Sequence, residues 1–189
     1  MTRIAIVTGS TRPGRVNPQV AQYIHSIASG REGFEYEVLD IADFDLPFYN
    51  ESIPTVLNGG NHETPEVYPW AEAVAGFDGF VFIVAEYNRG ITSGLKNAID
   101  YLYGEWNDKA AAIVSYGSSG GQIAAAALRD VLSTLQVAVV TQQPAFNLFT
   151  DFENMAVFTP SPVHANAIDG MLGQVEKWTK ALEATRVAA

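Results

Sequence analysis

The sequence contains no cysteine among its 189 residues. Disulfides, thiolate metal ligands and a cysteine nucleophile are therefore excluded. Positive charge is also scarce, because 11 lysines and arginines stand against 21 acidic residues and give a formal net charge of −10. Binding to nucleic acid or to an anionic membrane draws much of its affinity from positive charge, so neither partner is expected.

Long apolar runs are missing as well. No segment approaches the roughly 20 apolar residues that a membrane-spanning helix needs. The first residues enter a short strand-like run without the pattern of a signal peptide, so a cytoplasmic protein is the expectation. The length, together with a hydrophobic content of 48%, predicts one packed domain over residues 1–189.

Short β-branched and aromatic runs alternate with stretches of helical periodicity. The expected strands are Arg3–Thr8, Glu35–Asp40, Gly79–Ala85, Lys109–Tyr116 and Val137–Thr141. The expected helices are Pro18–Ser29, Glu66–Gly76, Ser93–Tyr103, Gln122–Leu135 and Pro162–Ala184. Nearly continuous apolar strands separated by helices are typical of a parallel sheet buried on both faces. The pattern predicts an α/β three-layer sandwich around a five-stranded parallel sheet in the order 2-1-3-4-5, with Glu35–Asp40 as an edge strand.

Three further features carry structural expectations. The stretch Ile41–Pro65 is long, irregular and proline-bearing, as functional or mobile loops often are. Tyr103 and Trp106 fit either burial beneath the next loop or an oligomer interface. The last helix is expected to bury one apolar face, formed by Ile168, Leu172, Val175, Trp178 and Leu182.

The segment "GSTRPGRVN", residues 9–17, joins the first strand to the first helix. Ligands of open α/β sheets bind beyond the carboxyl ends of the strands, and the N-terminus of a helix attracts anions. The segment therefore favours a phosphate monoester, held by Ser10, Thr11, Arg12, Arg15, Val16 and Asn17. It is neither a Walker loop nor a Gly-x-Gly-x-x-Gly fingerprint. The alternative is an ordinary strand-to-helix turn with solvated arginines.

Two more unusual loops follow the third and fourth strands, as "EYNRGITSGLKNAIDYL" and "YGSSGGQ". In the predicted strand order, all three loops converge on one edge of the sheet. Their exposed backbone and mixed polar groups suit a planar polar ring, which together with the phosphate indicates flavin mononucleotide (FMN). The candidate residues of these loops are Glu86, Tyr87, Asn88, Arg89, Tyr116, Gly117, Ser118, Ser119 and Gly120.

Taken together, the three loops resemble the NAD(P)H-dependent FMN reductase family, whose members have a flavodoxin-like fold. The similarity extends in order and spacing from the first strand through the helix after "YGSSGG". The resemblance implies that Ser10, Arg12 and Asn17 surround the FMN phosphate. It also implies that residues 86–89 lie along the ring and the ribityl chain, and that Ser118 and Gly120 lie near the dimethylbenzene or pyrimidine side of the ring.

Two positions depart from the pattern of the family. Arg15 stands where many members have serine, and its added charge is available either to FMN or to a phosphate of the pyridine nucleotide. Ala85 stands where many members have proline, which loosens the backbone before Glu86. These departures bear on substrate preference more than on flavin binding.

The resemblance implies an enzyme in which NADPH or NADH reduces FMN and is then replaced by a small-molecule electron acceptor. The implied acceptors are flavins, quinones, azo dyes and metal oxyanions. Because the cofactor carries the chemistry, no catalytic side chain is predicted. The three histidines show no metal-ligand spacing, so no metal site is expected either.

The resemblance further implies a homodimer or homotetramer with the flavin near the subunit contact. The alternative function is a flavodoxin-type electron carrier without NAD(P)H turnover. The acidic surface would suit docking of such a carrier to a basic redox partner. Against it, the phosphate loops of flavodoxins lack paired arginines.

Overall fold

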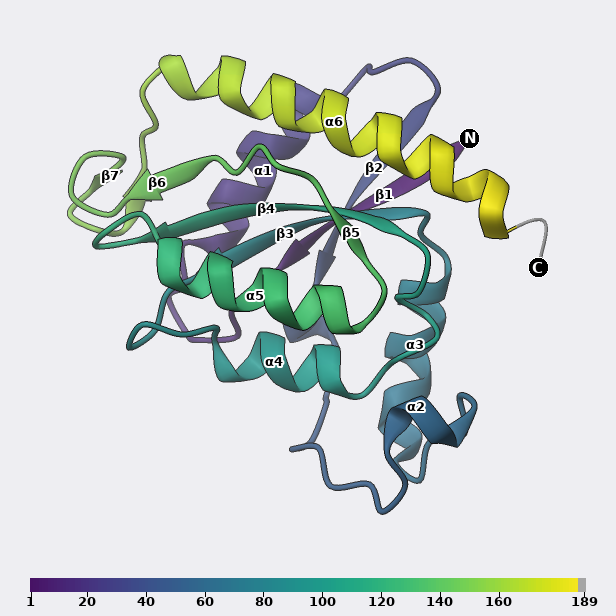
Figure 1. Cartoon of the computed structure of the whole chain (residues 1–189). Coiled ribbons are helices and arrows are strands. Elements are labelled where there is room, and N and C mark those ends of the chain that lie inside the picture. The colour runs from purple at the N-terminus through teal and green to yellow at the C-terminus, as the bar shows by residue number, and fades with distance from the viewer. Residues whose placement is uncertain (187–189) are drawn as a thin grey trace.

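A parallel sheet forms the centre of the protein, and the computed structural model describes residues 1–186 around it. Its strands run in the order β2-β1-β3-β4-β5, with β6 also pairing with β4 (Figure 1). The predicted order and the edge position of the second strand are thereby confirmed. The strands are β1 (Thr2–Thr8), β2 (Phe34–Asp40), β3 (Gly79–Ala85), β4 (Ala110–Gly117), β5 (Ala138–Val139) and β6 (Ala145–Asn147).

Helices cover both faces of this sheet and complete the predicted three layers (Figure 1). One face carries α1 (Asn17–Ala28) and α6 (Val163–Arg186). The other face carries α3 (Tyr68–Ala75), α4 (Ser93–Asp100) and α5 (Gln122–Thr134). Side chains alternate along a strand, so β1 sends Ile4 and Ile6 to the first face and Ala5 and Val7 to the second. Two apolar cores therefore share one sheet, and none of the helices within residues 1–186 is long and apolar enough to cross a membrane.

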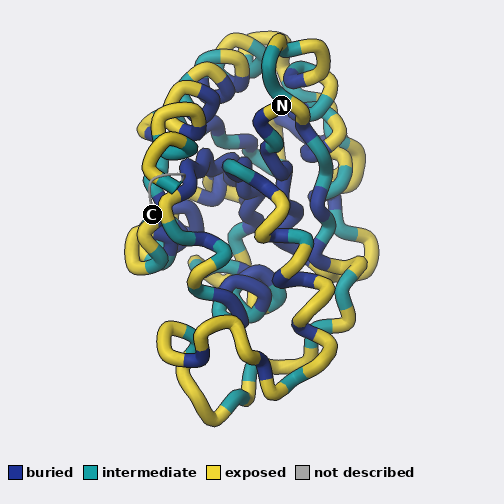
Figure 2. Tube along the Cα trace, turned by 90° about the vertical axis from the view of Figure 1, so that its right-hand side faces the viewer, coloured by how far each residue is buried: buried dark blue, intermediate teal, exposed yellow. Residues whose placement is uncertain are grey.

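The segment between β2 and α3 hangs below the sheet in Figure 1. It contains only short elements: η1 (Ile41–Asp43), α2 (Thr55–Asn58) and η2 (Pro65–Val67). Most of residues 42–64 are exposed or half-buried, as the yellow and teal lower end of Figure 2 shows. The expectation of a long irregular segment is confirmed.

The strand predicted at Val137–Thr141 is present as β5 but is shorter than predicted. Only Ala138 and Val139 pair there, and the chain leaves the sheet edge before returning as β6 beside Ser115–Gly117 of β4. Two features interrupt the pairing between β5 and β6. The Arg129 guanidinium donates to the Val140 carbonyl at 3.1 Å, and Pro144 has no N–H to donate to a neighbouring strand. The return also builds a small hairpin, β7 (Phe152–Glu153) with β8 (Val157–Phe158), which the sequence did not reveal.

Two tryptophans correct expectations about packing. Trp178 is half exposed, because Thr179 takes the inward position of α6 in its place. Thr179 packs directly against Gly79 of β3. A β-carbon at residue 79 would collide with the Thr179 hydroxyl, so glycine is required there. Trp106 is fully buried, with its ring 4.9 Å from that of Phe80, so it belongs to the core rather than to an interface.

Candidate functional site

Three loops meet at the carboxyl ends of β1, β3 and β4. The parallel register places these ends side by side, so the predicted convergence is confirmed. They enclose a cavity of about 210 Å³, called here the loop cavity. Its lining comprises Arg12, Val16, Ala85, Glu86, Tyr87, Tyr116 and Gly117 from the three loops, with Leu148 and Met155 from the segment after β6.

Asn17 ties the three loops together from beneath. Its side chain is fully buried, and its Oδ1 accepts the Gly9 N–H at 2.8 Å. Its amide nitrogen donates to the Ile83 carbonyl at 3.3 Å and to the Tyr116 hydroxyl at 3.1 Å. Both amide hydrogens are thus used within the protein, so this side chain positions the loops and has no donor left for an anion.

Tyr116 lies on the buried side of this junction. Burial raises the pKa of its hydroxyl to about 12, and the hydrogen bond from Asn17 only partly offsets that effect. The phenol is therefore protonated throughout the neutral range. It contributes a fixed polar wall and is not a general base at neutral pH.

The loop of residues 9–17, called here the anion loop, is built for close approach. Gly9 packs directly against the Ile83 carbonyl, where a β-carbon would not fit, and its own carbonyl accepts a hydrogen bond from Thr92 Oγ1. Several N–H groups of the loop have no acceptor among the described residues, namely those of Ser10, Thr11, Arg12, Gly14 and Val16. The loop leads into α1, so these donors add to the positive end of the helix dipole.

Tyr87 bridges the second loop to the anion loop. Its hydroxyl lies 2.9 Å from Ser10 Oγ and receives a hydrogen bond from Arg12 Nε at 3.2 Å. Arg12 and Arg89 are the two arginines for which residues 1–186 provide neither a carboxylate nor a carbonyl partner. Uncompensated positive charge therefore gathers at this edge of an otherwise acidic protein.

Arg15 is placed differently from Arg12. Its guanidinium pairs with Asp40 at the end of β2 at 2.5 Å, outside the lining of the loop cavity. Burial by itself would raise the pKa of Asp40, but hydrogen bonds from Thr8 Oγ1 and the Ala42 N–H, together with Arg15, lower it below its ordinary value. Both members of the pair are accordingly charged at neutral pH.

A tight turn shapes the second loop. The Tyr87 N–H donates to the Gly90 carbonyl at 3.1 Å, and the Gly90 N–H donates back at 3.0 Å. Asn88 and Arg89 between them have φ values of 50° and 65°, the left-handed conformation of a type I′ turn. Such strain in residues other than glycine concentrates at binding sites. The N–H groups of Asn88 and Arg89 have no acceptor among the described residues.

Glu86, predicted to contact a ligand, lines the loop cavity and also has a structural role. Glu86 Oε2 accepts the N–H groups of Ile123 and Ala124 at 3.0 and 3.1 Å, so it caps the N-terminus of α5. The N-cap residue of α5 is Gly121, which has no side chain that could accept these N–H groups.

The third loop presents backbone rather than side chains. Ser118 and Ser119 are exposed, and their N–H groups have no acceptor within residues 1–186. Gly121 must be glycine, because φ is 68° and a β-carbon would lie 2.7 Å from the Tyr116 carbonyl oxygen. Gly120, with φ of 76°, completes the tight turn.

Leu148 and Met155 form a wall that the sequence did not predict. The Leu148 N–H donates to the Gly117 carbonyl at 3.0 Å, which brings the segment after β6 against the third loop. Met155 lies at the tip of the β7–β8 hairpin with φ of 56°. Gln19 of α1 fixes that hairpin through the Ala156 carbonyl and the Phe158 N–H, both at 2.8 Å. The turn-forming Asn154 between two short aromatic-bearing runs was the available signal.

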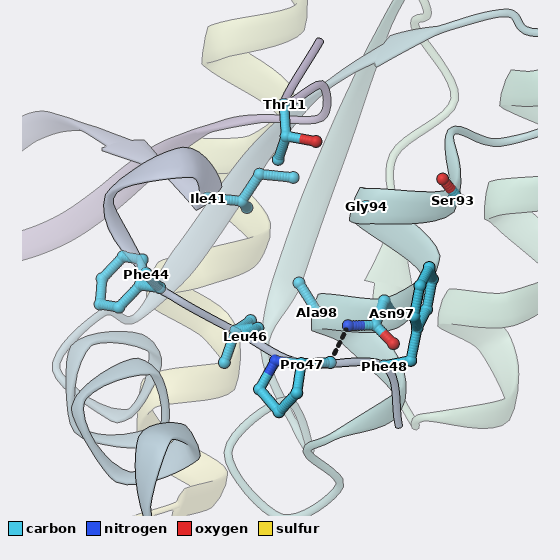
Figure 3. A pocket seen from close by; sticks show the side chains of 10 residues that line it. All are labelled: Thr11, Ile41, Phe44, Leu46, Pro47, Phe48, Ser93, Gly94, Asn97 and Ala98. Carbon is cyan, nitrogen blue, oxygen red and sulfur yellow. Dashed lines mark hydrogen bonds between the residues drawn. The ribbon is translucent and has the colours of Figure 1, made fainter. Parts of the chain in front are cut away.

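A second cavity, of about 320 Å³, lies on the Thr11 side of the anion loop (Figure 3). The start of α4 and residues 44–48, called here the strap, enclose the rest of it. We call it the strap cavity. Arg12, the next residue, borders the loop cavity, so one loop separates the two spaces.

Comparison with known proteins finds one family and several relatives. Residues 2–151 match the sequence profile of the family described as NADPH-dependent FMN reductase. A protein named NAD(P)H-dependent FMN reductase ntnL, from Nectria sp, is 41% identical over 136 residues, which cover 70% of this chain and 68% of that protein. A 2-hydroxy-1,4-benzoquinone reductase from Burkholderia sp is 32% identical over 148 residues, covering 74% of this chain and 75% of the relative.

Solved structures agree on the fold. The flavoenzyme FerB, an NAD(P)H:(acceptor) oxidoreductase from Paracoccus denitrificans, superposes with a TM-score of 0.69 at 24% identity. The superposition covers 97% of this chain and 98% of FerB. The flavodoxin-like architecture is therefore confirmed over nearly the whole length.

The capping role of Glu86 generates a stability prediction. Glu86→Ala leaves two N–H groups at the start of α5 without an acceptor, so the free energy of unfolding should fall by about 1–2 kcal/mol. Urea unfolding followed by circular dichroism measures this change. Asp130→Ala, which removes an exposed carboxylate from the same helix, is the matched control and should change stability by less than about 0.5 kcal/mol. Equal stability of Glu86→Ala and the parent would contradict the cap.

Proposed function

The chain belongs to the NADPH-dependent FMN reductase family, and from this we propose that the loop cavity binds FMN and that the protein passes reducing equivalents from NAD(P)H to a small-molecule acceptor. One observation carries the proposal. In a chain of net charge −10, Arg12 lines the loop cavity without an ionic partner among residues 1–186. Arg89, which also lacks one there, lies on the neighbouring loop, and both loops carry unpaired N–H groups. This arrangement suits a ligand that has an anionic end and a polar ring.

The anion loop fits the phosphate of FMN. An oxygen atom already lies between Ser10 Oγ and Arg12 Nε, because the Tyr87 hydroxyl occupies that position. A phosphate oxygen is a stronger acceptor than a phenol and would gain the unpaired N–H groups of the loop as well. We therefore assign phosphate binding to Ser10, Thr11, Arg12 and the backbone through Val16, with Asn17 as the buried residue that positions them.

The other two loops fit the ring. The unpaired N–H groups of Asn88, Arg89, Ser118 and Ser119 provide donors for its heteroatoms. Leu148 and Met155 provide an apolar wall of the kind that a dimethylbenzene edge requires. When bound, FMN supplies the redox chemistry by accepting a hydride from the nicotinamide and releasing its electrons to the acceptor.

The protein's own residues bind, orient and exclude water. Backbone donors near the ring favour the negative charge that accompanies reduction, because they are fixed before the reaction begins. Tyr116, whose pKa of about 12 keeps it protonated, offers no general base. We therefore name no side chain as a proton donor or acceptor, and we propose that solvent exchanges the proton.

A quinone is the acceptor that we propose. The similarity to a 2-hydroxy-1,4-benzoquinone reductase supports this choice. We also propose that residues 1–189 act as one FMN-binding domain, since both apolar cores pack on the same sheet. A cytoplasmic location stays a prediction from the sequence.

Hydride transfer from the nucleotide is the first property to test. Under anaerobic conditions, NADPH or NADH added to the FMN-loaded protein should bleach the flavin absorbance near 450 nm within seconds, because the family uses these donors. Stopped-flow spectroscopy with each nucleotide gives the donor preference. Tightly bound flavin that neither nucleotide bleaches would indicate an electron carrier instead.

Removal of the Arg12 guanidinium tests the phosphate assignment. Arg12→Ala should weaken FMN binding about 10- to 100-fold, since a charge-assisted contact to phosphate is lost, while riboflavin, which has no phosphate, should bind as before. Flavin fluorescence quenching measures both affinities. Arg3→Ala removes a paired arginine at the opposite end of β1 and serves as the matched control. A parallel loss of riboflavin affinity would show that Arg12 acts on the fold rather than on the phosphate.

We infer a homodimer as the smallest assembly. Large apolar side chains are exposed in and just before α2, namely Ile53, Val56 and Leu57, with Leu57 74% exposed, and a second copy would cover them. Sedimentation equilibrium at micromolar concentration should give twice the 20.4 kDa mass of the chain, or four times that mass if dimers pair. A single species of 20.4 kDa would exclude the assembly.

A further inference from the structure

The strap cavity is formed before any ligand binds. Asn97 of α4 clamps the strap by donating to the Pro47 carbonyl at 2.7 Å and accepting the Tyr49 N–H at 2.8 Å; Figure 3 shows the first of these bonds. On the opposite side, the Thr11 side chain packs so closely on α4 that a β-carbon at Gly94 would lie 3.1 Å from Thr11 Oγ1. The walls are therefore fixed by hydrogen bonds and close packing rather than by a mobile loop.

The walls of this cavity are largely apolar and partly aromatic. Ile41, Phe44 and Leu46 line it from the η1 and strap side, with the Phe48 side chain at its rim (Figure 3). Phe48 is 84% exposed, so its ring has an open face. A volume of about 320 Å³ lies within the range of small-molecule pockets. Such walls suit a flat aromatic ring.

Polar groups line the cavity near the start of α4. The hydroxyls of Thr11 and Ser93 lie there, beside the N-terminus of the eight-residue helix α4. The N–H groups of Ser93 and Gly94 have no acceptor among the described residues, whereas that of Leu95 is capped by Thr92. Hydroxyls and free helix N–H groups suit a ribose and an adjoining phosphate.

Charge near Thr11 permits that phosphate, whereas the exposed carboxylates of Asp43 and Asp45 flank Phe44 of the apolar wall. Asp40 immediately precedes Ile41 of the cavity wall, and a carboxylate there would repel an anion. Its pairing with Arg15 at 2.5 Å cancels this charge. Arg12, without an ionic partner among residues 1–186, lies one residue from Thr11.

We propose that the strap cavity binds the adenosine end of NAD(P)H; this inference rests on the proposed function. The donor carries a flat purine, a ribose and phosphates at one end and the reactive nicotinamide at the other. The strap cavity offers apolar aromatic walls and two hydroxyls beside free helix N–H groups, and the anion loop borders both this cavity, through Thr11, and the loop cavity, through Arg12. A dinucleotide that crosses this loop reaches both spaces. Phe48 and Ser93 then determine affinity for the donor without touching the flavin.

Truncated donors separate this binding from the chemistry. Reduced nicotinamide mononucleotide has the reactive ring but lacks adenosine. Phe48→Ala, which removes the aromatic rim, and Ser93→Leu, which narrows the polar end, should each lower kcat/KM about tenfold for NADPH or NADH and leave it unchanged for the truncated donor. Trp178→Ala is the matched control, because it also removes an exposed aromatic ring but lies outside the lining of both cavities. It should leave kcat/KM for both donors unchanged.

A parallel loss with both donors, or no loss with either, would overturn the inference. Calorimetric titration of the FMN-loaded protein with adenosine 5′-monophosphate gives a readout that needs no turnover. Binding by the parent that is at least tenfold weaker in Ser93→Leu supports the inference, and failure of the parent to bind overturns it. If neither nucleotide bleaches the flavin, the proposed function fails, and the titration still decides whether the strap cavity accepts an adenine nucleotide.

Discussion

The buried amide of Asn17 is the interaction on which the site depends. It joins Gly9, which follows β1, to Ile83 of β3 and to Tyr116 of β4. Three segments that lie far apart in the sequence are thereby held together. Without this amide, the buried Tyr116 hydroxyl would have no partner among the described residues, and unsatisfied buried polar groups are costly. The Gly9 N–H would keep only its bond to the Ile83 carbonyl, at 3.0 Å. The loops can present unpaired donors outward because this amide satisfies the groups beneath them.

Around the loop cavity, some charged and polar groups are bonded within the protein, and others are available to a ligand. Glu86 uses its carboxylate on the N-terminus of α5, and Asp40 and Arg15 neutralise each other. Arg12 and Arg89 have no such partner within residues 1–186, so their charge is available to a ligand. In a chain of net charge −10, a local positive edge attracts small anions, such as a flavin phosphate or a dinucleotide, while the rest of the surface repels them.

The anion loop contributes to two cavities rather than one. Arg12 faces the space proposed for the flavin, and Thr11 faces the strap cavity. A reductase must bring two ligands together in sequence, and one rigid loop between their binding spaces holds both at a fixed separation. The rigidity comes from contacts on either side, with Gly9 against Ile83 and Gly94 against Thr11.

The sequence by itself determined the strand order, the two-faced burial of the sheet and the convergence of the three loops. These follow from periodicity and from the parallel topology, which are properties of neighbouring residues and of general chain geometry. Glycine positions and the arginines of the first loop likewise pointed to an anion, because backbone freedom and charge are local properties.

Only the tertiary structure decided which polar groups of the site are already hydrogen-bonded within the protein. Asn17 bonds across 99 residues to Tyr116, and Glu86 across 37 to Ile123, so no local pattern reveals that their side chains are engaged. The break between β5 and β6 depends on Arg129, and it brings Met155 to the cavity from beyond the matched residues. Hydrogen-bond partners distant in sequence are chosen by packing, which is why the sequence located the site but the fold assigned its residues.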